Sequence, residues 1–298
     1  MIDEKNDQRQ DDDLGRRDFV TSVAAGVVAA AGTASGAILP VTEKDVEIKT
    51  PDGTCDAAFI YPERGSHAGV IIWTDVFGLR PSMRGIGKRI AAEGYAVLVP
   101  NPYYRVRKAP MWEDASGFSF SSQEDRAKLT PLTASISPDG TIERDAVAYV
   151  EFLDAQKQVN KNRKIGTQGY CMGGPLVMRT CAAVPDRIGA GGSFHGGSLV
   201  TDKPNSPHLL VPKIKARRMY FAISANDDPK QQGDNKWKPL REIAAENRLV
   251  AEFEVYKAQH GWCVPDMPKG PDGNPIYNKP DAEHAWSKLV ALYKAGLA

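Results

Sequence analysis

Short runs of apolar residues alternate with amphipathic segments along most of the chain, and this alternation restricts the fold more than any other feature. Continuous apolar runs such as 70–73 and 96–99 are typical of strands that are buried on both faces. The segment between them, 82–93, has helical spacing and ends at a glycine. Alternating strands and helices predict an α/β fold with a mostly parallel, doubly wound sheet flanked by helices.

Further elements continue the same alternation. We expect strands at 164–168, 188–192, 219–223 and 251–256, and helices at 142–156, 175–183, 237–248 and 281–295. Alternating residues in 45–49 and 55–61 predict an antiparallel hairpin at the edge of the sheet. Residues 100–140 are rich in Pro, Ser and aromatic side chains. This composition predicts an excursion from the sheet or a lid over a functional site. The chain contains neither a repeat nor a linker that would divide this body, which favours a single domain.

The first residues of the chain are expected to be an export signal. Arg16 and Arg17 precede an uncharged, weakly apolar stretch, 20–37, that ends in small residues. Two arginines followed by Phe19 resemble the twin-arginine signal, which would deliver the protein to the periplasm. A retained anchor and a plain tail are the alternatives. The expected organisation is a signal over 1–37 and one α/β domain over 38–298.

Composition excludes several classes of function. The 298 residues include 38 Lys and Arg against 37 Asp and Glu, so no strong field attracts nucleic acid or anionic lipid. The stretch 20–37 is only weakly apolar and contains several glycines, so it is a poor membrane anchor. We therefore expect no stable membrane insertion after cleavage of the signal. Four cysteines without a CxxC pair and five scattered histidines predict neither a metal nor another cofactor. The expected partners are a small-molecule substrate and the export machinery.

The motif G-Y-C-M-G-G lies at 169–174, directly after a predicted strand and before a predicted helix. This is the cysteine form of the nucleophile elbow, in which small flanking residues prevent collisions with neighbouring backbone. The helix that begins here aims its amide groups at the thiol and favours the thiolate of Cys171. The amide of Met172 faces the position of a developing oxyanion. The motif therefore predicts that Cys171 is a nucleophile.

A cysteine nucleophile requires a base, and the base requires an orienting acid. Asp227 and His260 each follow a predicted strand, at the sheet edge where such folds keep their active sites. Their order after the cysteine is that of an α/β-hydrolase triad. Asp228 remains an alternative acid. His195 also follows a strand, but it precedes the acid and is the weaker candidate for the base.

Together, these motifs resemble the dienelactone hydrolase family, a branch of the α/β-hydrolases with a Cys–Asp–His triad. The segments that carry the resemblance are G-Y-C-M-G-G, Asp227, His260–Trp262, Trp73–Leu79, Arg84, Ala91–Tyr95 and Asn101–Arg105. The resemblance covers 45–297. It implies an α/β-hydrolase fold and the hydrolysis of ester or lactone bonds through a thioester on the cysteine.

The resemblance also implies roles for residues around the triad. Val76 would supply a second oxyanion amide beside that of Met172. Asp75 stands where the family commonly has a Glu that holds the resting cysteine and takes part in its activation. Arg105 matches an arginine that contacts the substrate carboxylate. Trp262 would either line the acyl pocket or pack beneath it.

Two departures from the family pattern bear on the substrate. Asp75 is one methylene shorter than the usual Glu, and Val264 replaces an arginine found in enzymes of chloroaromatic breakdown. Fewer carboxylate clamps favour a neutral or less polar ester or lactone, unless Arg80 or Arg107 compensates. The Pro- and Gly-rich segment 264–278 either walls the substrate pocket or is a surface excursion.

Two other classes of function stay open on the same fold. In a periplasmic thiol-redox protein, Cys263 would act as the resolving cysteine for an oxidised Cys171, and a disulfide between them would favour this hypothesis. In a ligand-binding protein with a relic triad, binding would persist in Cys171→Ala without turnover of any ester.

Overall fold

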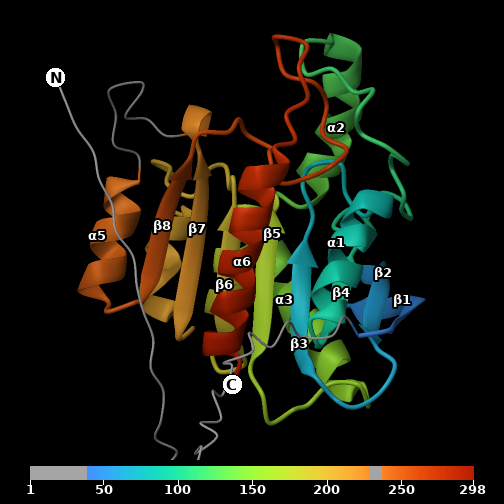
Figure 1. Ribbon diagram of the computed structural model, residues 1–298, viewed down its shortest axis with the longest axis vertical. Coiled ribbons are helices and arrows are strands. Elements are labelled where there is room, and N and C mark those ends of the chain that lie inside the picture. The colour runs from blue at the N-terminus through green and yellow to red at the C-terminus, as the bar shows by residue number, and fades with distance from the viewer. Residues whose placement is uncertain (1–38, 228–236) are drawn as a thin grey trace, which may run out of the picture. The chain divides into compact units, whose positions relative to one another are not determined.

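Eight strands form one mixed sheet in the computed structural model, which describes residues 39–227 and 237–298 (Figure 1). The strand order is β1-β2-β4-β3-β5-β6-β7-β8. β2 runs antiparallel to both β1 and β4, whereas all other neighbours are parallel. The strands are β1 (Val41–Thr50), β2 (Gly53–Pro62), β3 (Ala68–Trp73), β4 (Tyr95–Pro100), β5 (Ile165–Tyr170), β6 (Ile188–Phe194), β7 (Arg218–Ser224) and β8 (Ala251–Tyr256).

Helices cover both faces of the sheet because successive residues of each central strand point to opposite sides. In β3, Val70 and Ile72 join the core beneath α1 and α6, whereas Ile71 and Trp73 join the core beneath α3, α4 and α5. All four side chains are fully buried, which confirms the predicted doubly wound α/β fold. The helices are α1 (Pro81–Ala92), α2 (Gln123–Ser135), α3 (Thr141–Ala155), α4 (Gly173–Ala183), α5 (Lys238–Glu246) and α6 (Lys279–Gly296), with short 3-10 turns η1 (Pro207–Lys213) and η2 (Ala225–Asp227).

The first two strands form the hairpin that the alternating pattern predicts. β1 pairs with β2 from Val41 opposite Pro62 to Thr50 opposite Gly53, so a two-residue turn joins them. Both strands extend a few residues beyond the predicted segments. The hairpin forms one edge of the sheet, and β8 forms the other.

The excursion predicted over 100–140 contains a helix, α2, that the hydrophobic pattern does not reveal. Few residues of α2 are buried, and Pro131 lies inside it, so the segment lacks an amphipathic signature. A weaker signal is present at its beginning, where Ser122 accepts a hydrogen bond from the amide of Asp125. Such an N-terminal cap with acidic residues in the first turn is typical of a helix start.

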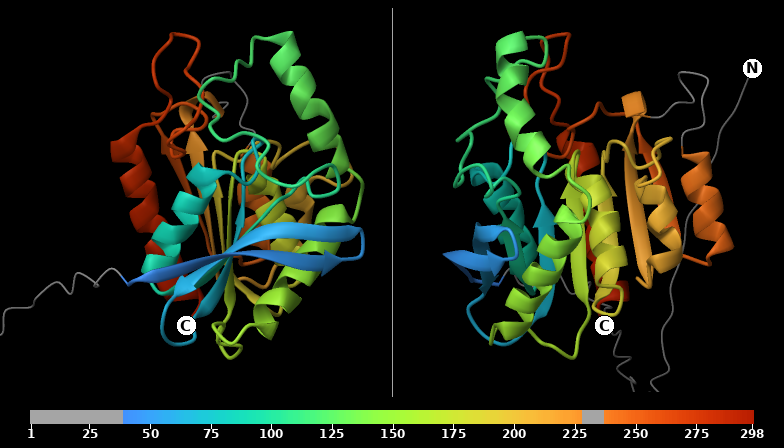
Figure 2. Two further views of the ribbon diagram at one scale, coloured as in Figure 1. Left: turned by 90° about the vertical axis from the view of Figure 1, so that its right-hand side faces the viewer. Right: turned by 180° about the vertical axis from the view of Figure 1, so that it is seen from behind.

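Two segments rise above the carboxyl ends of the parallel strands. Figure 2 shows α2 in green and the loop 257–278 in red and orange at this same end of the sheet in both views. Active sites of parallel α/β sheets lie at this edge. The two segments therefore border the region where the predicted catalytic residues should meet.

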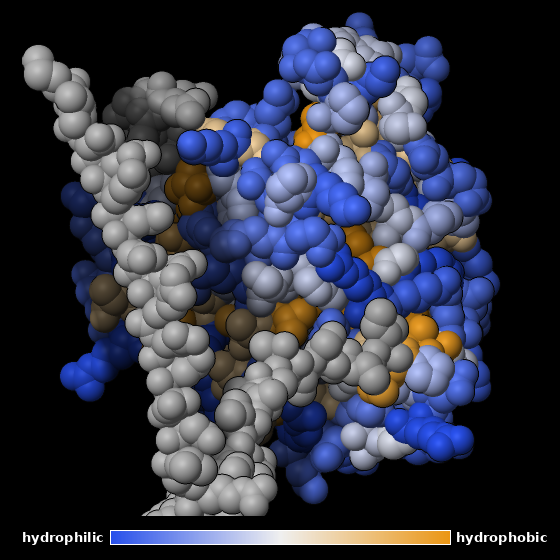
Figure 3. All heavy atoms as spheres, viewed as in Figure 1, coloured by the Kyte–Doolittle hydropathy of each residue, from blue (hydrophilic) through white to orange (hydrophobic). Residues whose placement is uncertain are grey.

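Figure 3 shows one face of the molecule, and the described residues on this face are mostly polar. Hydrophobic residues form only small separate patches there. No helix within 39–227 or 237–298 combines the length and apolar character needed to cross a membrane. The predicted export signal, 1–37, lies outside the described residues.

Candidate active site

Cys171 occupies a strained turn between β5 and α4. Its φ of +53° is in the left-handed region, which is uncommon for a residue with a side chain, and its amide donates a 3.0 Å hydrogen bond to the carbonyl of Phe194. A Cβ on Gly169 would lie 2.2 Å from the carbonyl oxygen of Gly173, and a Cβ on Gly173 would lie 2.5 Å from that of Trp73. The glycines thus allow the close backbone approach that the elbow requires.

Asp227 and His260 meet at the carboxyl ends of β7 and β8. Asp227 Oδ2 lies 2.5 Å from His260 Nδ1 and also accepts a short hydrogen bond from the hydroxyl of Ser224. The His260 amide donates a 2.8 Å hydrogen bond to Asn226 Oδ1. Asp227 therefore orients the imidazole, as expected of the acid of a triad, and Asn226 holds the backbone of His260. The alternative acid, Asp228, lies outside the described residues.

The electrostatic environment of His260 favours its protonated form. Burial alone lowers the pKa of His260, but interactions with the side chains of Asp227 and Cys171 outweigh burial and raise it to about 10. Cys171 and His260 line the same cavity, so the protonated imidazole would face an entering substrate.

His195, the weaker candidate for the base, is fully buried beside the triad rather than within the cavity lining. Its ring centroid is 4.8 Å from that of His260, and its Nδ1 is 3.4 Å from the sulfur of Cys263. Burial lowers the pKa of His195 well below its usual value, and His260 lowers it further. His195 is therefore a neutral neighbour of the triad, and the geometry pairs Asp227 with His260 instead.

The two predicted oxyanion residues lie beside Cys171. Val76 and Met172 line the same cavity as the thiol, and neither amide donates a hydrogen bond to another described residue. The hydroxyl of Tyr103 donates to the Val76 carbonyl at 2.8 Å and lies 3.1 Å from the sulfur of Met172. Tyr103 thus connects the two segments that carry these amides. Sequence reasoning did not assign it a role, although it lies within the matching segment 101–105.

Asp75 lines the same cavity as Cys171, and its carboxylate is bound by other partners. Its carboxylate forms a bidentate ion pair with Arg80, at 2.7 and 2.9 Å, and accepts the amide of Phe77 at 3.0 Å. Arg80 also binds both oxygens of Asp266 at 2.7 Å. Burial lowers the pKa of Arg80, but the two carboxylates raise it above its usual value, so the guanidinium stays charged. Asp75 therefore holds Arg80, and its expected contact with Cys171 stays a prediction.

Arg105 does not line the cavity over Cys171, so its expected contact with a substrate carboxylate stays a prediction. Its guanidinium binds Asp145 at 2.7 and 2.9 Å and Asp52 at 2.7 Å, and it lies over the ring of Tyr104. This places Arg105 at the hairpin and α3. Arg80 is committed to its two carboxylates, and Arg107 does not line the cavity either.

A cavity of about 840 Å³ opens over Cys171 and His260. The Pro- and Gly-rich segment 264–278 contributes Met267, Pro271 and Ile276 to its wall, which confirms the first of the two interpretations of that segment. Trp262 is fully buried, stacks on Tyr256 at 4.8 Å and does not line the cavity. It therefore packs beneath the site.

All four cysteines are free thiols. Cys263 lines a second cavity that shares no lining residue with the cavity over Cys171. Burial raises the pKa of the Cys263 thiol well above its usual value. The structure therefore contains no disulfide between Cys171 and Cys263.

Strand order, elbow and site together define an α/β-hydrolase. Residues 55–297 match the sequence model of the dienelactone hydrolase family, and the chain belongs to this family. The family places it among the hydrolases of ester and lactone bonds.

Known relatives agree with this assignment. A carboxymethylenebutenolidase homolog of Mus musculus is 28% identical over 224 residues, which cover 74% of this chain and 79% of the relative. The crystal structure of a dienelactone hydrolase from Anabaena variabilis is similar in fold, with a TM-score of 0.58, 15% identity and coverage of 87% of this chain and 99% of that one. A dienelactone hydrolase-like promiscuous phosphotriesterase from metagenomic libraries has a TM-score of 0.67, 20% identity and the same coverage.

Proposed function

We propose that the protein hydrolyses esters or lactones through a cysteine nucleophile and a thioester intermediate. The observation that carries the proposal is that Cys171 at the strained elbow and His260 line one cavity, while Asp227 binds His260 Nδ1. Thiolates attack activated esters readily. The proposed catalytic residues are therefore Cys171, His260 and Asp227, with the amides of Met172 and Val76 as the oxyanion hole.

In the first half of the reaction, the Cys171 thiolate attacks the carbonyl carbon, and the carbonyl oxygen becomes an oxyanion near the two amides. The tetrahedral intermediate collapses to a thioester as the alkoxide leaves with the proton of His260. In the second half, neutral His260 takes a proton from water, which attacks the thioester. Collapse of this second intermediate releases the carboxylic acid and regenerates the Cys171 thiolate and the imidazolium.

The wall of the cavity along α4 is mainly apolar. Met172, Pro175, Leu176 and Arg179 follow one another at helical spacing and form one wall along α4. The guanidinium of Arg179 is already bound to Glu143 at 2.8 Å, so this cation is partly neutralised. Val264, at the position of the family's second arginine, is fully buried outside the cavity lining. These features support a neutral ester or lactone over a dicarboxylate.

Trapping the intermediate tests the chemistry directly. Protein mixed with p-nitrophenyl acetate and quenched in acid after a few milliseconds should carry an acetyl group on the peptide that contains Cys171. The modification should be lost on treatment with hydroxylamine, because thioesters react with it. An acetyl group found instead on a serine, or none during active turnover, would contradict the thioester mechanism.

The dependence of kcat/KM on pH above neutrality should differ between esters with different leaving groups. The pKa of His260 is raised to about 10, so its proton is present at neutral pH and is lost as the pH rises through that value. An alkyl ester needs this proton for its alkoxide, whereas p-nitrophenolate leaves without one. We expect kcat/KM for an ethyl ester to fall above about pH 10. The value for the p-nitrophenyl ester of the same acid should stay level.

Asp227→Asn provides the control for this profile. Asp227 raises the pKa of His260, so removal of the Asp227 carboxylate should lower that pKa. The decrease in kcat/KM for the ethyl ester should then begin at a lower pH. Identical alkaline limbs for the two esters would show that His260 is not the proton donor.

We also propose that the protein acts in the periplasm after export by the segment 1–37. Support comes from the sequence alone, namely Arg16, Arg17 and the weakly apolar stretch that follows. In a Gram-negative host, the full chain should appear in the periplasmic fraction. The charge-conserving variant Arg16→Lys/Arg17→Lys should stay in the cytoplasm, with esterase activity in both fractions reporting folded protein. Equal distribution of the two proteins would refute a twin-arginine route.

A further inference from the structure

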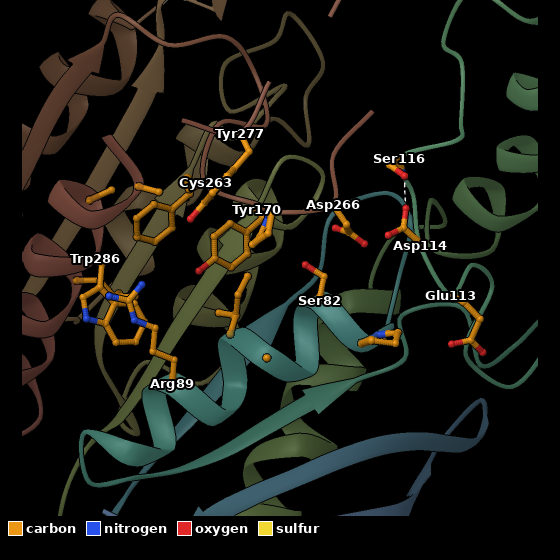
Figure 4. A pocket seen from close by; sticks show the side chains of 18 residues that line it. Ser82, Arg89, Glu113, Asp114, Ser116, Tyr170, Cys263, Asp266, Tyr277 and Trp286 are labelled. Carbon is orange, nitrogen blue, oxygen red and sulfur yellow. Dashed lines mark hydrogen bonds between the residues drawn. The ribbon is translucent and has the colours of Figure 1, made fainter. Parts of the chain in front are cut away.

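A second cavity, of about 590 Å³, lies between α1, α6 and the segment that follows the catalytic histidine (Figure 4). None of its lining residues also lines the cavity over Cys171. Neighbours in the chain face different cavities: Asp266 lines the second cavity and Met267 the first, and Tyr277 lines the second and Ile276 the first. The segment 263–278 is thus a partition with one cavity on each side. A volume of several hundred Å³ suits a small organic ligand.

One end of the second cavity is aromatic. Tyr170, Phe194, Tyr277 and Trp286 line it, and Figure 4 shows Tyr170 and Trp286 on the side away from the acidic residues. Arg89 lies in this end, but its guanidinium is bound to the carboxylate of Glu283 and lies 3.9 Å over the ring of Trp286. The positive charge is therefore already neutralised, and the remaining surface can hold an apolar or aromatic group.

The other end carries an excess of negative charge. Glu113, Asp114 and Asp266 lie there (Figure 4). Glu113 and Asp114 form no ion pair with a described residue, and the Asp114 carboxylate accepts the amide of Ser116 at 2.7 Å. Asp266 shares the single guanidinium of Arg80 with Asp75, so this group of three keeps one net negative charge. A cationic group entering this end would find carboxylates without a full complement of positive charge.

We propose that the second cavity is a binding site for a small organic cation with an aromatic body, such as an arylalkylammonium ion. The ring would lie against Tyr170 and Trp286, where aromatic contacts stabilise it. The ammonium group would approach Glu113, Asp114 and Asp266 at the other end. This site is separate from the catalytic cavity, and binding to it needs no turnover of an ester.

Calorimetric titration of the protein with 2-phenylethylammonium tests the proposal, with 2-phenylethanol and 3-phenylpropionate as the neutral and anionic probes. The cation should bind at least tenfold more tightly than either analogue. In Glu113→Gln/Asp114→Asn its affinity should fall about fivefold to tenfold, the size expected for two exposed charge pairs. The control Glu151→Gln/Glu246→Gln removes two exposed acids elsewhere and should leave the affinity unchanged, since Glu151 and Glu246 lie outside this cavity.

A variant that fills the cavity locates the site. Gly85 lines the second cavity, and a Cβ placed on it meets no other atom within 4 Å. Gly85→Leu should therefore abolish binding of the cation while its thermal unfolding temperature and its esterase activity stay close to those of the parent. The proposal is overturned if the three probes bind equally, if the two-acid variant binds the cation as tightly as its control, or if binding survives in folded Gly85→Leu.

Discussion

Cys171→Ala should lower ester hydrolysis by a factor of about 10³ or more, because removal of a nucleophile leaves only the oxyanion site and binding. The variant should fold normally. Alanine adds no atom to the tight elbow around Gly169 and Gly173, where contacts of 2.2 and 2.5 Å would arise only from Cβ atoms on the glycines. Initial rates with p-nitrophenyl acetate in reducing buffer, on protein that begins at Ile38, measure the effect. Circular dichroism reports the fold.

Cys263→Ala is the matched control, since it removes the other partly exposed thiol while leaving the catalytic cavity intact. We expect it to retain most of the activity. A loss of similar size in both variants would favour the thiol-redox hypothesis, and full activity in Cys171→Ala would contradict the cysteine mechanism. Binding of a ligand by Cys171→Ala, with no turnover by the parent, would favour a relic triad.

The regular elements could be predicted because their signal is local. Continuous apolar runs mark strands buried on both faces, and β3, β4 and β7 lie within a few residues of their predicted positions. α2 was not predicted because it buries few residues and contains Pro131, so its hydrophobic pattern has no helical period. Its stability comes from an N-terminal cap and from the packing of Leu129 and Leu132, and two buried residues are too few to form a helical pattern.

The candidate site could also be predicted only in part. Cys171, Asp227 and His260 each follow a strand, and the parallel sheet brings them to one edge, so chain order alone predicted their meeting. The partners of Asp75 and Arg105 could not be predicted by this route. Each carboxylate or guanidinium selects among several opposite charges in space, and Asp266 reaches Arg80 across 186 positions of the chain. The family resemblance identified these residues, but it did not indicate the ion pairs that Asp75 and Arg105 form in the structure.

Arg80→Met should lower the free energy of unfolding by about 3–5 kcal/mol at pH 7, because it leaves two carboxylates near the core without their shared partner. Asp75 is fully buried, and the side chain of Asp266 is 11% exposed. The same change should reduce esterase activity, since Asp75 directly precedes Val76 of the proposed oxyanion hole. Urea denaturation of the parent and the variant measures the first effect, and initial rates measure the second.

Arg84→Met, one turn further along α1, is the matched control. Arg84 binds Glu43 and Asp45 near the surface, with 27% of its own side chain exposed, so we expect a cost of about 0.2–1 kcal/mol. Unpaired buried carboxylates have raised pKa values in the folded state, and they destabilise it as the pH rises. Arg80→Met should therefore recover stability relative to the parent between pH 7 and pH 5, and Arg80→Met/Asp266→Asn should be less destabilised at pH 7. Equal losses in the two single variants, or a loss in Arg80→Met that does not change with pH, would mean that packing of the Arg80 side chain rather than its charge stabilises the loops around Cys171.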